Sequence, residues 1–160
     1  MDVPPFVVVD TSAAVEVLIS DAEYHHAYVD LFERVCRNGS AIAYCDLLEA
    51  ELAEAAFTWD VKRADPKGWR AARRDRPASA RAREHEVLSA WRDVSDSEHA
   101  LQIRMTAVVD DAVELMSTTG LASYDAIHLA VALALNAPLM AHDRRLLLEA
   151  SQFGEVLTCR

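Results

Sequence analysis

The sequence predicts an α/β domain built on a central, mainly parallel β-sheet. Short apolar runs, typical of strands covered on both faces, alternate along the chain with segments of helical spacing. This alternation is typical of parallel strands joined by helical crossovers. With 160 residues and 52% hydrophobic content, the chain is long enough to bury such a core as a single domain over residues 1–160, without disulfides or metal staples.

Each element has a local signal. Asp46, with Glu49 three residues later, has the spacing of a helix capping box, and Gly120 is typical of a helix C-terminus. Residues 123–135 are apolar almost all round, which indicates a helix packed inside the domain. In chain order we expect a strand at 6–10, helices from about 12 and over 22–37, a strand at 40–44, helices from 46, over 83–91 and over 101–117, the buried helix at 123–135, a strand at 137–142, a helix at 143–150 and a strand at 155–159.

Composition restricts the cellular context. Cys36, Cys45 and Cys159 are odd in number and lack C-x-x-C spacing, as in proteins of the reducing cytoplasm. The only early apolar run is too short for a signal peptide or a membrane span. We therefore expect a cytoplasmic protein without membrane association.

Charge is distributed unevenly along the chain. The formal net charge is −10, which argues against a polyanionic partner. Residues 62–83, however, hold nine Lys or Arg against two Asp, a local net charge of +7. We interpret the stretch at about 60–83 as an irregular basic insertion between helices. It is either a solvated loop or an arm that contacts RNA or a partner protein, with Arg70, Arg73 and Arg74 as candidate contacts.

Three aspartates lie where parallel sheets collect ligands. Asp10 and Asp143 follow predicted strands, and Asp125 opens the buried helix. Ligands of such sheets bind at the carboxyl ends of the strands. Each aspartate also has a purely structural explanation, because Asp is favoured as a helix N-cap and in the first helical turn.

Glu51 favours the functional interpretation. At ~100° per residue, Glu51 falls on the helix face that carries Leu48, Leu52 and Ala55, although it could instead reach the edge of that face. A buried carboxylate costs several kcal/mol unless it is compensated, and no Lys or Arg lies within a turn of Glu51 in the sequence. Convergent carboxylates repel one another unless a divalent cation binds them, and oxygen ligands select Mg²⁺ or Mn²⁺ over zinc.

Other metal and nucleotide sites are excluded by spacing. The HEVLS stretch at 85–89 lacks the second histidine of a zinc-binding H-E-x-x-H motif, and the adjacent His25 and His26 cannot share a helix face. Four isolated glycines form neither a G-x-G-x-x-G nor a Walker pattern. We expect His128 and His142, which stand beside the proposed acids, to be packing or turn residues.

The four acidic positions resemble those of the PIN-domain ribonucleases, in particular the VapC-like toxins of bacterial toxin–antitoxin pairs. The motifs are VVVDTSA with Asp10, LLEAELAEA with Glu51, SYDAIHLAVAL with Asp125 and PLMAHDRRLL with Asp143, in the family's order. The resemblance implies a three-layer α/β/α sandwich and cleavage of RNA by a water molecule activated by one or two Mg²⁺ or Mn²⁺ ions. The four acids would be the catalytic residues and metal ligands, Asp143 directly or through water. A homodimer and a cognate antitoxin are also implied.

Two departures from the family pattern and two alternative functions stay open. Ala141 stands where the family often has a small hydroxyl residue, and the basic insertion lengthens the interval from Glu51 to Asp125. Thr11 and Ser12 orient Asp10, contact the substrate phosphate or cap the next helix. The alternatives are a non-catalytic RNA-binding or regulatory protein of the same fold, and an aspartate-based phosphoryl-transfer enzyme. The latter is disfavoured because Ser12 replaces the second acid of its D-x-D pattern.

Overall fold

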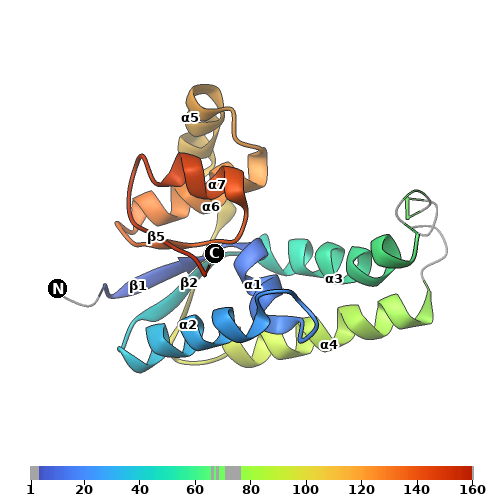
Figure 1. The fold of residues 1–160 in the computed structure, drawn as a ribbon. Coiled ribbons are helices and arrows are strands. Elements are labelled where there is room, and N and C mark those ends of the chain that lie inside the picture. The colour runs from blue at the N-terminus through green and yellow to red at the C-terminus, as the bar shows by residue number, and fades with distance from the viewer. Residues whose placement is uncertain (1–3, 66, 68, 71–76, 160) are drawn as a thin grey trace.

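The computed structural model describes residues 4–65, 67, 69–70 and 77–159, which form a three-layer α/β/α sandwich (Figure 1). Its centre is a parallel sheet with the strand order β3-β2-β1-β4-β5. The strands are β1 (Phe6–Val9), β2 (Ala41–Cys45), β3 (Ala100–Ile103), β4 (Leu139–Met140) and β5 (Val156–Leu157). Because all strands run the same way, their carboxyl ends share one edge of the sheet. The predicted fold class is confirmed.

Helices cover both faces of the sheet. In Figure 1 the C-terminal helices α5, α6 and α7 lie above the sheet, and the N-terminal helices lie below it and to one side. The helices are α1 (Thr11–Leu18), α2 (His25–Arg37), α3 (Leu48–Ala64), α4 (Ala78–Ser95), α5 (Val109–Thr119), α6 (Ser123–Ala134) and α7 (Arg144–Ala150). Within the described part of the chain, no helix is both long and apolar enough to cross a membrane.

Successive side chains of β1 point to opposite faces of the sheet, so the hydrophobic core is divided in two. Val7 and Val9 of β1 pack with α1, α2, α3 and α4, whereas Val8 packs with α5, α6 and α7. All three valines are at most 1% exposed. A continuous apolar strand therefore supplies both cores, as expected for a strand buried on both faces.

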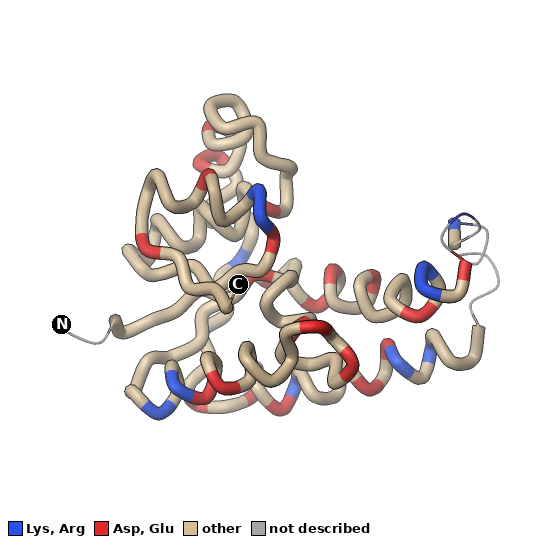
Figure 2. The backbone as a smooth tube through the Cα atoms, viewed as in Figure 1, with Lys and Arg blue, Asp and Glu red and all other residues tan. Residues whose placement is uncertain are grey.

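The helices α3 and α4 form a hairpin that projects beyond the sheet (Figure 1). A small separate core of Phe57, Val61 and Ala80 joins the two helices, and Trp69 packs against it. Lys and Arg gather toward the far end of the hairpin (Figure 2). The irregular basic segment is shorter than expected from the sequence, because α3 continues through Ala64 and α4 begins at Ala78. Apolar contacts between the two helices outweigh the repulsion among their basic residues.

One strand was predicted as helix. Residues 101–117 were expected to be helical throughout, but β3 occupies Ala100–Ile103 and α5 begins only at Val109. Leu101 and Ile103 alternate with Gln102 and Arg104 at the strand period of two, and β3 pairs with β2 at the edge of the sheet. The helical pattern that follows masked this short strand signal.

The predicted capping role of Asp46 is wrong. The N-cap of α3 is Leu47, which makes no side-chain capping bond. The Asp46 carboxylate instead accepts a hydrogen bond from the Met105 backbone N–H at 2.8 Å. The residue therefore ties the end of β2 to the segment that follows β3, a partner that the local sequence does not reveal.

The two helix ends that glycines mark are confirmed, whereas several helix starts differ from the prediction. Gly39 and Gly120 follow α2 and α5 with φ of 86° and 69°, the left-handed conformation that favours glycine. The second helix begins at His25 rather than at residue 22. The strands expected at 137–142 and 155–159 are present but shorter.

Candidate metal and active site

Asp10 lies at the carboxyl end of β1 and is the N-cap of α1. One oxygen of its carboxylate, Oδ2, accepts hydrogen bonds from the Ser12 backbone N–H, at 2.9 Å, and from the Ser12 hydroxyl. The residue is 4% exposed. The structural and functional explanations both apply here, because capping engages Oδ2 while Oδ1 lies 3.7 Å from Nε2 of His128.

Ser12 links the ends of two adjacent strands. Its hydroxyl donates to Asp10 and accepts from the backbone N–H groups of His142, at 2.8 Å, and Asp143, at 3.0 Å. A hydroxyl has one donor and two acceptor lone pairs, so these three bonds use its full capacity. Of the roles expected for Ser12, orientation of Asp10 is the one that its contacts favour.

Glu51 lies in the first turn of α3 and is held by two side chains. Its Oε2 accepts from the Thr11 hydroxyl and from Nε2 of His128, each at 2.7 Å. The Glu51 side chain is 15% exposed. Glu51 is therefore largely buried, as its position on the apolar face of the helix predicts, and a histidine from α6 compensates part of its charge.

His128 is a part of this site that the sequence prediction missed. It was expected to be a packing or turn residue, but it is 1% exposed and contacts two of the four acids through Nε2. Burial, the largest influence, would lower the pKa of His128, yet its hydrogen bond to Glu51 and the nearby carboxylate of Asp10 outweigh burial and raise it. The available signal was its spacing, three residues after Asp125 on an otherwise apolar helix.

Asp125 lies in the first turn of α6 but does not cap the helix. The N-cap is Ala122, which makes no side-chain capping bond. Burial, reinforced by the charges of Asp10 and Asp143, raises the pKa of Asp125 from 3.8 to about 6. Helix capping therefore does not explain this carboxylate, and its raised pKa reflects its burial first and the negative charge around it second.

Asp143 follows β4 and is the N-cap of α7. Its Oδ1 accepts from the backbone N–H groups of Arg145, at 2.8 Å, and Leu146, at 2.9 Å. The capping explanation holds for this residue as well. Ala141, two residues earlier, is fully buried in the apolar core under α6 and α7, and the Ser12 hydroxyl supplies the hydrogen bond to the Asp143 backbone.

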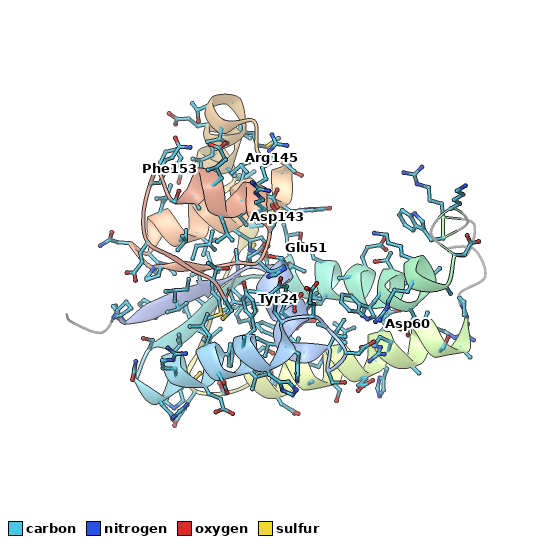
Figure 3. All side chains as sticks on the ribbon, viewed as in Figure 1. Tyr24, Glu51, Asp60, Asp143, Arg145 and Phe153 are labelled. Carbon is cyan, nitrogen blue, oxygen red and sulfur yellow. The ribbon has the colours of Figure 1, made fainter. Side chains whose placement is uncertain are left out.

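All four predicted acids line one cavity of about 690 Å³. It opens at the carboxyl edge of the sheet, where Figure 3 shows Glu51 and Asp143 near each other between the two helical layers. The cavity continues along α3, where Trp59, Lys62 and Arg63 line it. The sequence prediction did not single out these last three residues.

The donor set fits a hard divalent cation. Four carboxylates face one cavity, and oxygen ligands of this kind suit Mg²⁺ or Mn²⁺. Among the residues that the structure describes, no three His, Cys, Asp or Glu side chains are already drawn together as a metal cluster. Burial is the main cause of the raised pKa of Asp125, and the charges of Asp10 and Asp143 add a repulsion that a bound cation would relieve.

The predicted arginine contacts do not line this cavity in the described part of the chain. The Arg70 guanidinium lies over the Trp69 ring, 5.4 Å from its centroid. Arg73 and Arg74 lie outside the described residues. Arg63, which does line the cavity, pairs with Asp21 at 2.6 Å.

Comparison with known proteins gives one family and a shared fold. A family profile described as PIN domain matches residues 7–150, and a search of curated proteins found no match. PAE2754 from Pyrobaculum aerophilum has a similar structure, with a TM-score of 0.54 and 22% identity over 94% of this chain and 82% of that one. VapBC2 from Rickettsia felis, solved bound to a DNA fragment from their promoter, has a TM-score of 0.59 and 13% identity over 95% of this chain and 97% of that one. At these identities the two structures support the fold alone.

Proposed function

Because the chain belongs to the PIN domain family, a family of nucleases, we propose that it is an endoribonuclease that works with Mg²⁺ or Mn²⁺. The observation that carries the proposal is the single cavity lined by Asp10, Glu51, Asp125 and Asp143. A non-catalytic protein of the same fold would have no need for all four carboxylates, whose mutual repulsion destabilises it. A metal site is the simplest explanation for four carboxylates around one cavity.

The four acids would hold one or two ions, with Asp143 as a ligand directly or through water. When bound, the metal supplies an activated water and stabilises negative charge on the phosphate. The remaining residues orient the ligands. Ser12 fixes Oδ2 of Asp10, and Thr11 fixes Oε2 of Glu51.

We further propose that the protein is the toxin of a toxin–antitoxin pair. Its motifs resemble those of VapC-like toxins, and its fold is similar to that of VapBC2 from Rickettsia felis. The partners would be an antitoxin protein and a second copy of this chain. The free thiols of Cys36, Cys45 and Cys159 support a cytoplasmic location.

Metal-dependent RNA cleavage is the direct test. Purified protein should cleave single-stranded RNA with Mg²⁺ or Mn²⁺, and excess EDTA should stop cleavage. Glu51→Gln should lower kcat by at least about 100-fold, because the loss or weakening of one ligand disturbs the ion that activates water. Gel-resolved cleavage of a labelled RNA measures both effects.

Glu49→Gln is the matched control, because Glu49 lies in the same first turn of α3 and does not line the cavity. It should keep parental cleavage. Cleavage that persists in EDTA, in a preparation free of contaminating ribonuclease, would refute the metal mechanism.

A further inference from the structure

His128 reaches two of the proposed ligands from the opposite helical layer. It belongs to α6, whereas Glu51 belongs to α3 and Asp10 follows β1. Its Nε2 lies 2.7 Å from Oε2 of Glu51 and 3.7 Å from Oδ1 of Asp10. The imidazole thus stands between the two carboxylates, at 1% exposure.

The side-chain polar contacts that the structure gives His128 run through one nitrogen, Nε2. Within the described residues, the buried Nδ1 has no hydrogen-bond partner. Since the ionised carboxylate of Glu51 only accepts hydrogen bonds, Nε2 must be the donor. The contact is directional and engages Oε2, the same oxygen that accepts from Thr11.

This arrangement compensates the buried charge of Glu51, and it also fixes its orientation. Two donors on Oε2 hold the carboxylate in one rotation, so the other oxygen, Oε1, remains available as a ligand. Groups that hydrogen-bond to metal ligands orient them, and their loss typically weakens metal binding or activity by about 10–100-fold.

We propose that His128 is a positioning residue of this site, which holds Glu51 and Asp10 in the arrangement that a divalent cation binds. The effect of His128 on metal binding rests on the proposed metal-dependent function. The hydrogen bond between His128 and Glu51 does not depend on that function. His128 does not touch the substrate or the reacting atoms. It acts through the two carboxylates.

The first experiment measures Mn²⁺ binding with three substitutions of His128. Gln places an amide nitrogen near the position of Nε2, whereas Asn places it near Nδ1 and Leu has no donor. The Mn²⁺ concentration that gives half of the maximal melting-temperature increase should rise about 10–100-fold for His128→Leu and His128→Asn. It should stay close to the parental value for His128→Gln.

The same variants separate positioning from substrate binding. In RNA cleavage at subsaturating Mn²⁺, kcat should fall for the Leu and Asn variants and recover with Gln, while KM for RNA stays near the parental value. Unchanged Mn²⁺ binding in the Leu variant would overturn the proposal. Tighter Mn²⁺ binding would also overturn it, because it would identify His128 as a competing cation.

A double-mutant cycle in EDTA tests the contact without metal or activity. His128→Leu should lower the melting temperature of the parent, since it leaves Glu51 as a buried, poorly compensated charge. In a Glu51→Gln background the same substitution should cost much less, because the charge is gone. An equal loss in both backgrounds would mean that the imidazole only fills space.

These outcomes distinguish the proposal from the proposed function. A parent that neither binds Mn²⁺ nor cleaves RNA would refute the nuclease function, and the cycle in EDTA would still decide whether His128 and Glu51 are coupled. A parent that binds Mn²⁺, with a Leu variant that binds it equally well, would refute only the positioning role.

Discussion

The carboxylates of Asp10 and Asp143 each cap a helix while they line the cavity. Capping engages one oxygen of each, Oδ2 of Asp10 and Oδ1 of Asp143. A carboxylate offers about four acceptor positions on two oxygens, so capping and metal binding are compatible. Residue type and order in the sequence were sufficient to single out these acids as candidates, and both line the cavity. They could not reveal that each acid caps a helix and lines the cavity at the same time.

His128 shows the limit of prediction at the residue scale. Its partner Glu51 lies 77 positions away in the chain, so no local pattern connects them. The sequence did indicate that Glu51 is buried and needs compensation. It could not identify the compensating side chain, because that contact depends on how α6 and α3 face each other across the sheet edge.

Asp125 provides a prediction of stability. Its folded-state pKa of about 6 exceeds the ordinary 3.8, so the native state binds more protons than the unfolded state between these values. Stability contributed by this proton is present below pH 3.8 and is lost as the pH rises through about 6. In EDTA at pH 7.5, Asp125→Asn should raise the melting temperature by about 2–4 °C, the shift produced by about 1 kcal/mol in a domain of this size.

The control for this experiment is Asp110→Asn, which replaces an exposed acid in the first turn of α5. It should leave the melting temperature nearly unchanged at pH 7.5. If Asp125→Asn melted below the parent in EDTA, the carboxylate would be stabilising the fold, and charge crowding at the site would be disproved.

At the scale of elements, apolar runs predicted the buried strands better than the edge strand. β1 is buried on both faces, so its continuous run of valines indicates a strand. β3 is flanked by one strand only, and its half-exposed residues resemble the helical pattern that follows. Tertiary pairing with β2 decides its conformation, and the local sequence does not contain that information.

Helix α3 lines the part of the cavity that extends beyond the four acids. Glu51, Ala55, Thr58 and Lys62 recur at helical spacing on one face, and all line the cavity. Over the eight residues from Glu51 to Trp59 the helix rises by ~12 Å. The element that supplies a proposed metal ligand therefore also supplies Trp59, Lys62 and Arg63 to the wall of the same cavity.

The arginines of the basic insertion provide a prediction of RNA binding. Neutralising Arg70, Arg73 and Arg74 to Gln should weaken binding of single-stranded RNA. It should also flatten the salt dependence by ~0.7 in the logarithmic slope for each phosphate that the variant no longer neutralises. Binding is measured by fluorescence anisotropy between about 50 and 200 mM salt, in EDTA and a Glu51→Gln background so that the RNA stays intact.

Neutralising Arg34, Arg37 and Arg92 to Gln gives a control with the same change in net charge on the ends of α2 and α4. This control should keep the parental slope. Equal slopes for both triple variants would assign Arg70, Arg73 and Arg74 to solubility or to a partner protein.

At the scale of the whole molecule, the site joins the two helical layers at the edge of the sheet. Glu51 comes from α3, which shares a core with α1, α2 and α4, and His128 comes from α6, which shares the other core with α5 and α7. Ser12 bridges the ends of β1 and β4. A cation bound there would contact groups from both layers. Metal binding should therefore stabilise the folded protein as a unit.

The last prediction combines metal binding with pH. In EDTA, stability should fall as the pH rises from about 4 to above 6.5. Between pH 3.8 and about 6 the folded state keeps the Asp125 proton that the unfolded state has lost, and the raised pKa of His128 has the same effect above pH 6.5. Asp21 acts in the opposite direction at low pH. Burial would raise its pKa, but the Trp59 hydrogen bond and nearby arginines lower it, so its stabilisation is lost as the pH falls through its folded pKa.

Saturating Mn²⁺, at about 100 times its Kd, should add about 2.7 kcal/mol to the free energy of unfolding. This gain should be largest above pH 7 and shrink toward pH 5, where the ion must displace the Asp125 proton. Melting curves at pH 5 and 7.5, with and without Mn²⁺, measure both effects, and an equal Mn²⁺ shift at the two pH values would exclude Asp125 as a ligand.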